Sequence, residues 1–128
     1  MDWSYLAGFF DGEGNIHFNK IKNKSYQILC RLYSSNENVL LEIKNFIGFG
    51  KIYMAKSTGI YELTISDKNS NLIFLKSICA HSILKKRLIN FVLENYDFNK
   101  GGNNLSFDII GFHSMITRKN VEKSHRKI

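Results

Sequence analysis

The 128-residue chain contains no proline, only two cysteines and no long apolar run. Cys30 and Cys79 stand among apolar neighbours, which favours buried, reduced thiols over a disulfide or a zinc site, and an intracellular, reducing compartment. No run approaches the roughly 18 apolar residues of a membrane-spanning helix, and the start of the chain lacks the basic segment of a signal or transit peptide. We therefore expect a soluble protein without a membrane partner.

The absence of proline accompanies an abundance of asparagine, isoleucine, lysine and phenylalanine. This bias is typical of an AT-rich coding genome such as that of a mitochondrion or a chloroplast. If the gene lies in such an organelle, we expect the protein to act there.

Length and charge set the class of protein. Hydrophobic residues make up 44% and charged residues 23%, which are ordinary values for a globular protein. We expect one domain over residues 1–128, with a core over about 1–99 and a helical, basic extension over about 105–128. Eighteen Lys and Arg against eleven Asp and Glu give a formal charge of +7, which favours an anionic partner, although simple solubility would also explain it.

The spacing of apolar residues predicts helices and hairpins in alternation. Helical spacing over residues 2–11 changes at residue 15 to a period of two, and a turn over 22–25 leads to a second alternating run over 25–33. Helical spacing returns over 36–47, where Gly48 is the expected stop. A second hairpin follows, with strands over 50–55 and 60–66 around a turn at 56–59.

Helices fill the rest of the chain. One opens at Asp67, one covers residues 83–98, and one more is expected over 107–116 after a loop at 101–104. The order α-β-β-α-β-β-α predicts an α+β fold in which two hairpins form a curved, four-stranded antiparallel sheet. Helices back one face of this sheet, and the other face stays open.

The stretch LAGFFDGEG over residues 6–14 places three glycines and two acids at the end of the first helix. Glycine costs about 0.5–1 kcal/mol relative to alanine inside a helix, so something other than helix propensity must compensate. Gly8 and Gly12 are four residues apart on one helical face, where a second helix can approach backbone to backbone. Such a pair is common by chance, but the acids and the immediate change to strand period make the combination specific.

These nine residues resemble, in register, the LAGLIDADG motif of homing endonucleases. The predicted element order is that family's αββαββα core, and the segments 47–50 (IGFG) and 84–87 (LKKR) fall where its members often carry similar segments. The resemblance covers the chain up to about Asn99. It implies a saddle-shaped sheet that binds double-stranded DNA.

Only one copy of the motif is present, and single-motif members of the family act as homodimers. The resemblance therefore implies that two motif helices pack at a symmetry axis on a pseudopalindromic DNA target. The expected interface residues are Leu6, Ala7, Gly8, Asp11 and Gly12.

The resemblance also implies a metal site at the end of the motif. Glu13 stands where the family usually has an aspartate, and its carboxylate and the Gly12 carbonyl would bind Mg²⁺, a hard cation that prefers oxygen ligands. Asp11 would cap the partner's helix or orient the interface. Without the motif, Glu13 would be interpreted as a solvated acid, although an acid is unfavourable near a helix C-terminus.

Two further catalytic residues follow from the alignment with the family. Lys85 matches the basic residue that the family places near the scissile phosphate, and Lys86 is the alternative. Without a catalytic role, these lysines would simply form a solvent-exposed basic face of the helix. Ser34 aligns, after a shift of one residue, with a polar side chain that positions water.

Strand alternation predicts the DNA-binding side chains. If Ile16 and Phe18 pack on the helices, the residues between them point to the open face. The full set is Asn15, His17, Asn19, Ser25, Gln27, Arg31, Lys51, Tyr53, Glu62 and Thr64. Amides and arginines pair with adenine and guanine in the major groove, and a glutamate can accept from cytosine, but a polar outer face is also normal for any half-covered sheet. Five lysines at turns or element ends are expected at phosphates, namely Lys20, Lys22, Lys24, Lys56 and Lys68.

The sequence thus predicts a site-specific endonuclease that hydrolyses both strands of a long DNA target and promotes mobility of the intron encoding it. Two alternatives use the same scaffold. One is a maturase that binds intron RNA and assists splicing, and the other is a non-catalytic DNA-binding protein. The acid at Glu13 argues against the second alternative but not against the first.

Overall fold

The computed structural model describes residues 1–21 and 25–116. Its elements are α1 (Trp3–Glu13), β1 (Gly14–Ile21), β2 (Ser25–Ser34), α2 (Glu37–Ile47), β3 (Lys51–Met54), β4 (Tyr61–Ile65), α3 (Lys68–Cys79) and α4 (Lys86–Asn95). A further helix covers residues 109–116. The predicted order of helices and strands is confirmed.

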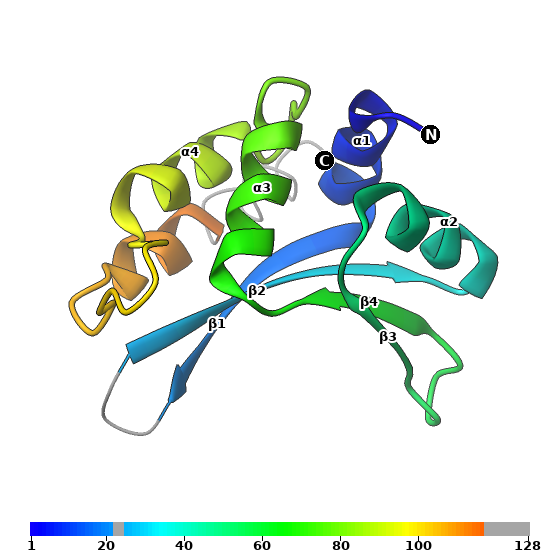
Figure 1. The fold of residues 1–128 in the computed structure, drawn as a ribbon, viewed down its shortest axis with the longest axis horizontal. Coiled ribbons are helices and arrows are strands. Elements are labelled where there is room, and N and C mark those ends of the chain that lie inside the picture. The colour runs from blue at the N-terminus through cyan, green and yellow to red at the C-terminus, as the bar shows by residue number, and fades with distance from the viewer. Residues whose placement is uncertain (22–24, 117–128) are drawn as a thin grey trace, which may run out of the picture.

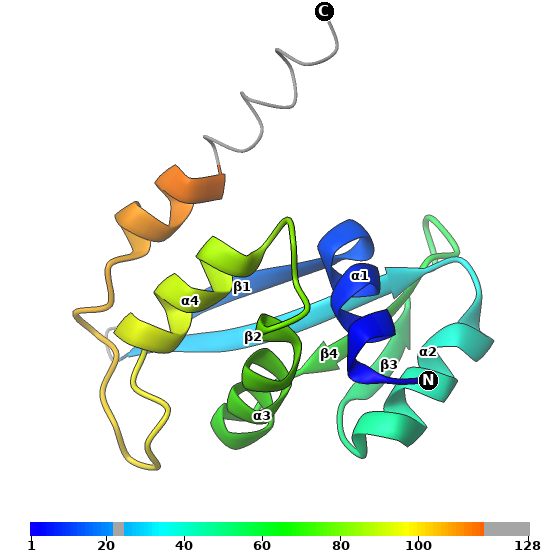
Figure 2. The ribbon, with the colours of Figure 1, turned by 90° about the horizontal axis from the view of Figure 1, so that it is seen from above.

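The four strands form one antiparallel sheet in the order β1-β2-β4-β3. The helices lie on one side of this sheet, and its opposite face is left uncovered (Figure 1). Seen from above, α3 and α4 lie over one part of the sheet and α1 and α2 over the other (Figure 2). The predicted α+β fold, a curved sheet with one open face, is therefore confirmed.

Alternating apolar side chains make the covered face of the sheet. Ile16 and Phe18 in β1 point to the helices and are at most 9% exposed, and three residues of β2 continue this row with complete burial. Those three are Ile28, Cys30 and Leu32. The residues that alternate with these in each strand point to the open face, as the period of two predicts.

The two ends of α2 follow their sequence signals. The Asn36 side chain accepts a hydrogen bond from the Asn38 backbone N–H at 2.9 Å and caps the start of the helix. Gly48 ends it in the left-handed region, with φ 87°, where a residue without Cβ is favoured.

The boundaries of α1 and α4 differ from the prediction. The helix α1 continues two residues further, to Glu13, because the Gly14 N–H still bonds the Phe10 carbonyl. The helix α4 begins at Lys86 and not at residue 83, because residues 83–85 form a turn held by a side chain of α1. It ends at Asn95, after which Tyr96 is extended.

A buried asparagine joins three elements where β2 and β4 part. Asn71, in α3, is fully buried, and its amide donates to the carbonyls of Ile28, Ile65 and Asp67 at 2.9–3.3 Å. Its oxygen accepts from the Cys30 N–H at 3.1 Å. The side chain thus satisfies backbone groups of both strands at and beyond their last pair, which is Cys30 with Ile65.

The C-terminal part of the described chain joins the core through aromatic rings. Phe107 and Phe112 are buried and lie 4.6 and 4.8 Å, ring centroid to centroid, from Phe18 of β1. The helix predicted over 107–116 is found over 109–116. The rest of the predicted extension, residues 117–128, lies outside the described residues.

Both cysteines are free, as predicted. Cys30 is fully buried, and burial raises the pKa of its thiol far above the ordinary value. Cys79 is only partly buried, and its Sγ donates to the Asn90 side chain. None of the described helices is long and apolar enough to cross a membrane.

Candidate active site and nucleic-acid interface

Glu13 is the last residue of α1, and its side chain is exposed at the junction with β1. The Gly12 carbonyl is among the last four of the helix, which have no intrahelical donor. The C-terminal end of a helix carries partial negative charge, so these oxygens stand in a potential that attracts cations. An open pocket at this point is lined by Gly12, Glu13, Gly14, Asn15, Tyr33, Ala55, Thr58, Ile60 and Glu62.

The donor set fits a hard cation in part. A carboxylate and a backbone carbonyl are the oxygen ligands that Mg²⁺ accepts, and an exposed position leaves room for the waters that it retains. The described residues contain no group of three or more His, Cys, Asp or Glu able to hold a metal ion. A cation held by Glu13 and the Gly12 carbonyl would therefore need further oxygens from water, from a phosphate or from a second copy.

Asp11 occupies a different environment from Glu13. It is 8% exposed, and its carboxylate accepts hydrogen bonds from the Ser82 hydroxyl at 2.5 Å and from the backbone N–H of residues 83, 84 and 85 at 2.7–3.2 Å. Burial alone would raise the pKa of Asp11, but these four bonds outweigh it and hold the pKa below its ordinary value. The carboxylate caps the turn into α4 of its own chain and not a partner's helix, which was one of the two predicted roles. The other role, orienting the interface, stays a prediction.

Lys85 is brought to the same end of α1. Its Nζ donates to the Asp11 backbone carbonyl at 2.6 Å and lies 5.7 Å from the centroid of the Phe10 ring. A cation at a helix C-terminus is favourable, so Lys85 offsets part of the negative charge beside Glu13. Lys86 is exposed on α4. Of the two lysines that the sequence left open, Lys85 is the one whose ammonium bonds the end of α1.

Ser34 does not line the pocket. It stands on the helix-facing parity of β2, and its Oγ accepts from the Asn36 N–H at 3.0 Å in the turn that leads to α2. The neighbouring Tyr33 has the opposite parity and lines the pocket beside Glu13. A shift of one residue along a strand changes the face, so the aligned position was on the wrong side of the sheet. The alternation of the sequence could have identified Tyr33.

Apart from Asp11, which is bonded within its own chain, the residues of the predicted dimer interface divide into two groups. Leu6 and Ala7 are completely buried in the core of their own chain, so they cannot contact a partner in this fold. Gly8 and Gly12 are exposed, and a Cβ built at either one would meet no atom within 4 Å. The fold of one chain therefore does not require glycine at these two positions.

The strand register brings the predicted DNA-binding residues together on the open face. Arg31 stands opposite Asn15 on one side and Thr64 on the other, and Lys51 follows on β3. A second row joins Tyr33, Glu62 and Tyr53. By register all ten predicted residues have the parity of this face, namely Asn15, His17, Asn19, Ser25, Gln27, Arg31, Lys51, Tyr53, Glu62 and Thr64. Leu29 also lies on it, opposite His17, and was not predicted as a contact.

Ser25, one of these ten residues, is already occupied. Its Oγ accepts a hydrogen bond at 3.0 Å from the Asn104 backbone N–H, in the loop after α4. The sequence separation of 79 residues explains why strand alternation could not reveal this partner. Ser25 contributes to the fold by tying that loop to the start of β2.

Several polar side chains on the open face bond one another. The His17 ring contacts the Asn19 side-chain oxygen at 2.7 Å, and the Thr64 hydroxyl donates to Glu62 at 2.5 Å. Arg31 donates through Nε to the Asn15 oxygen at 3.1 Å. These pairs fix side-chain orientations before any ligand is bound.

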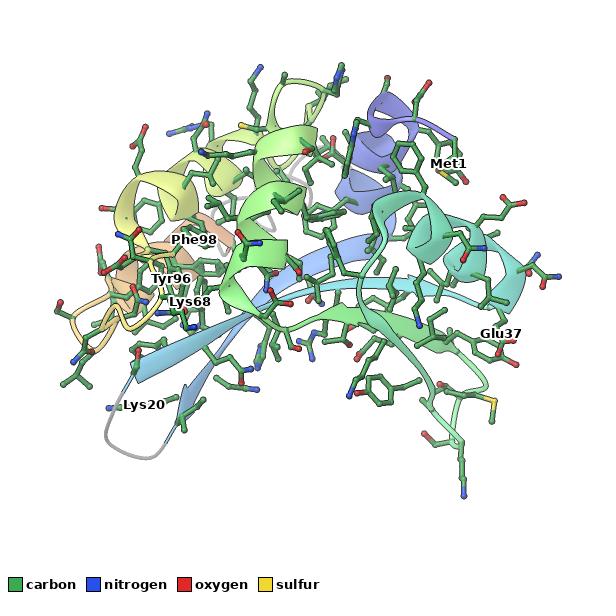
Figure 3. All side chains as sticks on the ribbon, viewed as in Figure 1. Met1, Lys20, Glu37, Lys68, Tyr96 and Phe98 are labelled. Carbon is green, nitrogen blue, oxygen red and sulfur yellow. The ribbon has the colours of Figure 1, made fainter. Side chains whose placement is uncertain are left out.

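The lysines predicted at phosphates have different environments. Lys20 and Lys56 are exposed, and Lys22 and Lys24 lie outside the described residues. Lys68 instead donates to the carbonyls of Asn99 and Gly102 at 3.3 and 2.8 Å. Its ammonium also lies 5.9 Å from the Tyr96 ring centroid (Figure 3). The prediction for Lys68 was wrong, because a loop distant in sequence takes up its hydrogen bonds.

Comparison with known proteins identifies the family. A family model described as LAGLIDADG endonuclease matches residues 6–96. A search of curated protein sequences found no match.

Solved structures share the fold at low sequence identity. The homing endonuclease I-CvuI, in complex with an I-CreI target, is 20% identical over 72% of this chain and 63% of its own, with a TM-score of 0.64. The archaeal intron-encoded homing endonuclease I-Vdi141I, complexed with DNA, is 19% identical over 93% of this chain and 96% of its own, with a TM-score of 0.58. The meganuclease I-AabMI, bound to uncleaved DNA, is 20% identical over 73% of this chain and 36% of its own, with a TM-score of 0.62. This chain thus spans less than two thirds of the I-CvuI chain.

The family match covers the motif at the end of α1, both hairpins of the sheet and the helices up to α4. The chain therefore belongs to the LAGLIDADG endonuclease family.

Proposed function

We propose that the protein is a homodimeric, metal-dependent endonuclease that cuts both strands of a specific, pseudopalindromic DNA site and so promotes mobility of the intron that encodes it. The observation that carries this proposal is the position of Glu13. It is exposed at the end of α1, between the glycine face of that helix and the polar open face of the sheet. A DNA duplex on the open face would bring its backbone to this carboxylate.

Binding to DNA is supported by the chemistry of the open face. The face presents amide, arginine, lysine and hydroxyl groups, which are the types that contact base edges and phosphates, and the chain carries a formal charge of +7. Its curvature suits a cylindrical ligand. The solved structures of I-CvuI and I-Vdi141I, which share the fold, are complexes with DNA.

A homodimer is supported by the incomplete site of one chain. One Glu13 and one Gly12 carbonyl do not complete a ligand set, and two α1 helices packed through Gly8 and Gly12 would bring two such sets together. This chain spans about a third of I-AabMI, whose chain is long enough for two such units. The dimer would also join two open faces into one longer saddle.

The chemistry assigned to this centre is phosphodiester hydrolysis. Water attacks the phosphorus, the bond to the leaving sugar oxygen breaks, and that oxygen takes up a proton. A divalent cation, when bound, supplies an activated water and neutralises charge on the phosphate. Glu13 and Gly12 would hold it, and Lys85, fixed beside them by the Asp11 carbonyl, would stabilise negative charge that develops on the phosphate oxygens.

A cleavage assay tests the proposal. The protein is incubated with the intronless allele of its host gene and Mg²⁺, beside a Glu13→Gln variant and a control Glu42→Gln variant of an exposed acid on α2. We expect double-strand cleavage by the wild type and the control, and none by Glu13→Gln, which should still bind. Cleavage that survives in Glu13→Gln would refute the assigned role of this residue.

The cleavage assay and a separate splicing assay distinguish the two alternatives. Binding to the allele without cleavage by either protein would indicate a non-catalytic DNA-binding protein. If splicing of the precursor RNA depends on added protein, with Glu13 intact or replaced, the protein acts as a maturase.

A further inference from the structure

Three residues on the open face next to the pocket form a connected group. Asn15 is the second residue of β1, two positions after Glu13, and stands directly opposite Arg31 of β2. Tyr33 lies two residues further along β2, on the same face, and lines the pocket together with Asn15. All three side chains are partly buried.

Both polar ends of the Asn15 amide are engaged. Its Oδ1 accepts from Arg31 Nε at 3.1 Å, and its Nδ2 donates to the Tyr33 hydroxyl at 3.4 Å. Reversing the amide would set its NH₂ group against the Nε–H of Arg31, so the arginine fixes the orientation. An asparagine that contacts adenine needs the same two groups for the base. Asn15 is therefore poorly disposed to recognise a base by itself.

The bond to Asn15 prepares Arg31 for one mode of recognition. The bond engages Nε of Arg31 and leaves the two terminal nitrogens to other partners. These two nitrogens form the end-on fork that matches O6 and N7 of guanine. Because the guanidinium is planar, one bond at Nε also restricts the plane of this fork. Thr64, which pairs with Arg31 on the neighbouring strand β4, donates its hydroxyl to Glu62 and does not compete for the Arg31 guanidinium.

We propose that Asn15 is a positioning residue that holds Arg31 for end-on recognition of a guanine in each half-site, near the cleavage centre. The inference rests on the proposed function as a DNA-binding protein. The guanine belongs to the inner part of the half-site because Asn15 lies at the Glu13 end of β1, whereas Asn19 lies four residues further out. The role replaces the prediction that Asn15 itself contacts a base.

The test uses the duplex that the full-length wild-type protein selects from a random library. Each guanine of this duplex is replaced in turn by 7-deazaguanine, which lacks the N7 acceptor, and dissociation constants are measured for each duplex. We expect one guanine per half-site at which this replacement weakens wild-type binding about tenfold. The Arg31→Ala variant should lose this sensitivity entirely, and Asn15→Ala should lose most of it at the same guanine.

Two more variants separate positioning from direct contact. The double variant Asn15→Ala/Arg31→Ala should discriminate no less than Arg31→Ala alone, because Asn15 acts through Arg31. Asn15→Asp keeps the acceptor for Nε and should retain the guanine preference, measured as a ratio of affinities. An asparagine that contacted adenine would lose its preference in the same variant, because aspartate has no N–H donor.

Asn19→Ala, on the same strand and face but bonded to His17, is the matched control and should leave that guanine preference unchanged. The inference is overturned if Asn15→Ala changes the preference at a different base pair from Arg31→Ala, or if no guanine is sensitive to loss of N7. A wild-type protein that selects no duplex at all would refute the proposed function and this inference with it. Circular dichroism of each variant confirms that it is folded before binding is measured.

Discussion

Asp11 and Glu13 stand two residues apart at the end of α1, and their surroundings are opposite. The Asp11 carboxylate is buried and accepts four hydrogen bonds from the turn into α4, whereas Glu13 is exposed at the pocket. Lys85 returns from that turn to the Asp11 carbonyl. The first acid of the motif therefore fixes the end of α1 against α4, and this fixes the backbone that presents Glu13.

Asp11→Asn should destabilise the folded chain by about 2–3 kcal/mol at neutral pH. The asparagine side chain carries no charge, and its NH₂ group would face the hydroxyl and N–H donors that the carboxylate accepts from. The folded-state pKa of Asp11 is lowered, so its stabilisation is complete above the unfolded-state pKa of about 3.9 and is lost as pH falls through the folded value. Urea unfolding at pH 7, 5, 4 and 3 measures this. The difference between wild type and variant should stay constant from pH 7 to 5 and shrink below pH 4.

Glu42→Gln, at an exposed acid of α2, is the control for this series and should leave the free energy of unfolding nearly unchanged at each pH. A difference between wild type and Asp11→Asn that is as large at pH 3 as at pH 7 would contradict the assigned role of the carboxylate.

Lys85→Met tests the charge beside Glu13. The methionine retains most of the packing on Phe10 but removes the ammonium, so cleavage should slow about 100-fold or more while DNA binding changes little. Single-turnover cleavage with saturating protein measures the rate. Lys86→Met, on the adjacent exposed lysine, should slow cleavage less than about threefold. Equal losses in the two variants would mean that both lysines act only through general attraction to DNA.

At the scale of elements, the junction of α3 with the sheet depends on Asn71. In Asn71→Leu, the leucine side chain has a volume similar to that of asparagine but cannot form hydrogen bonds. The buried carbonyls of Ile28 and Ile65 and the Cys30 N–H would then lose their side-chain partner. We expect a loss of about 3 kcal/mol or more in the free energy of unfolding, measured in urea. Asn69→Ala, at an exposed position on the same helix, should change it by less than about 0.5 kcal/mol. A stable Asn71→Leu variant would show that water can replace the side chain.

Local signals predicted the elements well, and distant partners explain where they failed. Asn36 and Gly48 mark the ends of α2 because a cap and a left-handed residue act within a few positions. Alternation along β1 and β2 assigned the open face correctly because side-chain direction in a strand has a period of two. The start of α4 was misplaced because it is held by Asp11, more than 70 residues earlier.

The candidate site was predictable to the same degree. Glu13 and Lys85 belong to segments that resemble the family, and both lie at the C-terminal end of α1. The misplaced residues depend on contacts that those segments do not encode. Ser34 fell on the wrong face through a one-residue shift, and Lys68 and Ser25 are bonded to the loop after α4. Leu6 and Ala7 match the motif because they pack the core, not because they face a partner.

At the scale of the whole molecule, the described chain would supply half of the proposed homodimer. It has one Glu13, one open sheet face and one exposed pair of glycines on α1. Glycine lowers helix stability, and neither Gly8 nor Gly12 has a neighbour in its own chain that would exclude a Cβ. We therefore propose that the two glycines serve the close approach of a second α1 helix, and not the folding of a single chain.

Substitution of Gly8 separates folding from assembly. Gly8→Leu should leave the isolated chain folded, and more stable by about 0.5–1 kcal/mol, because helix propensity rises and the side chain meets no neighbour. The same side chain should prevent two α1 helices from packing closely, so the variant should sediment as a monomer and cleave no DNA. Glu42→Leu, at an exposed site of α2, controls for added apolar surface and should still dimerise and cleave. Sedimentation velocity at the concentration of the cleavage assay gives the answer, and a Gly8→Leu variant that dimerises and cleaves like the wild type would remove α1 from the interface.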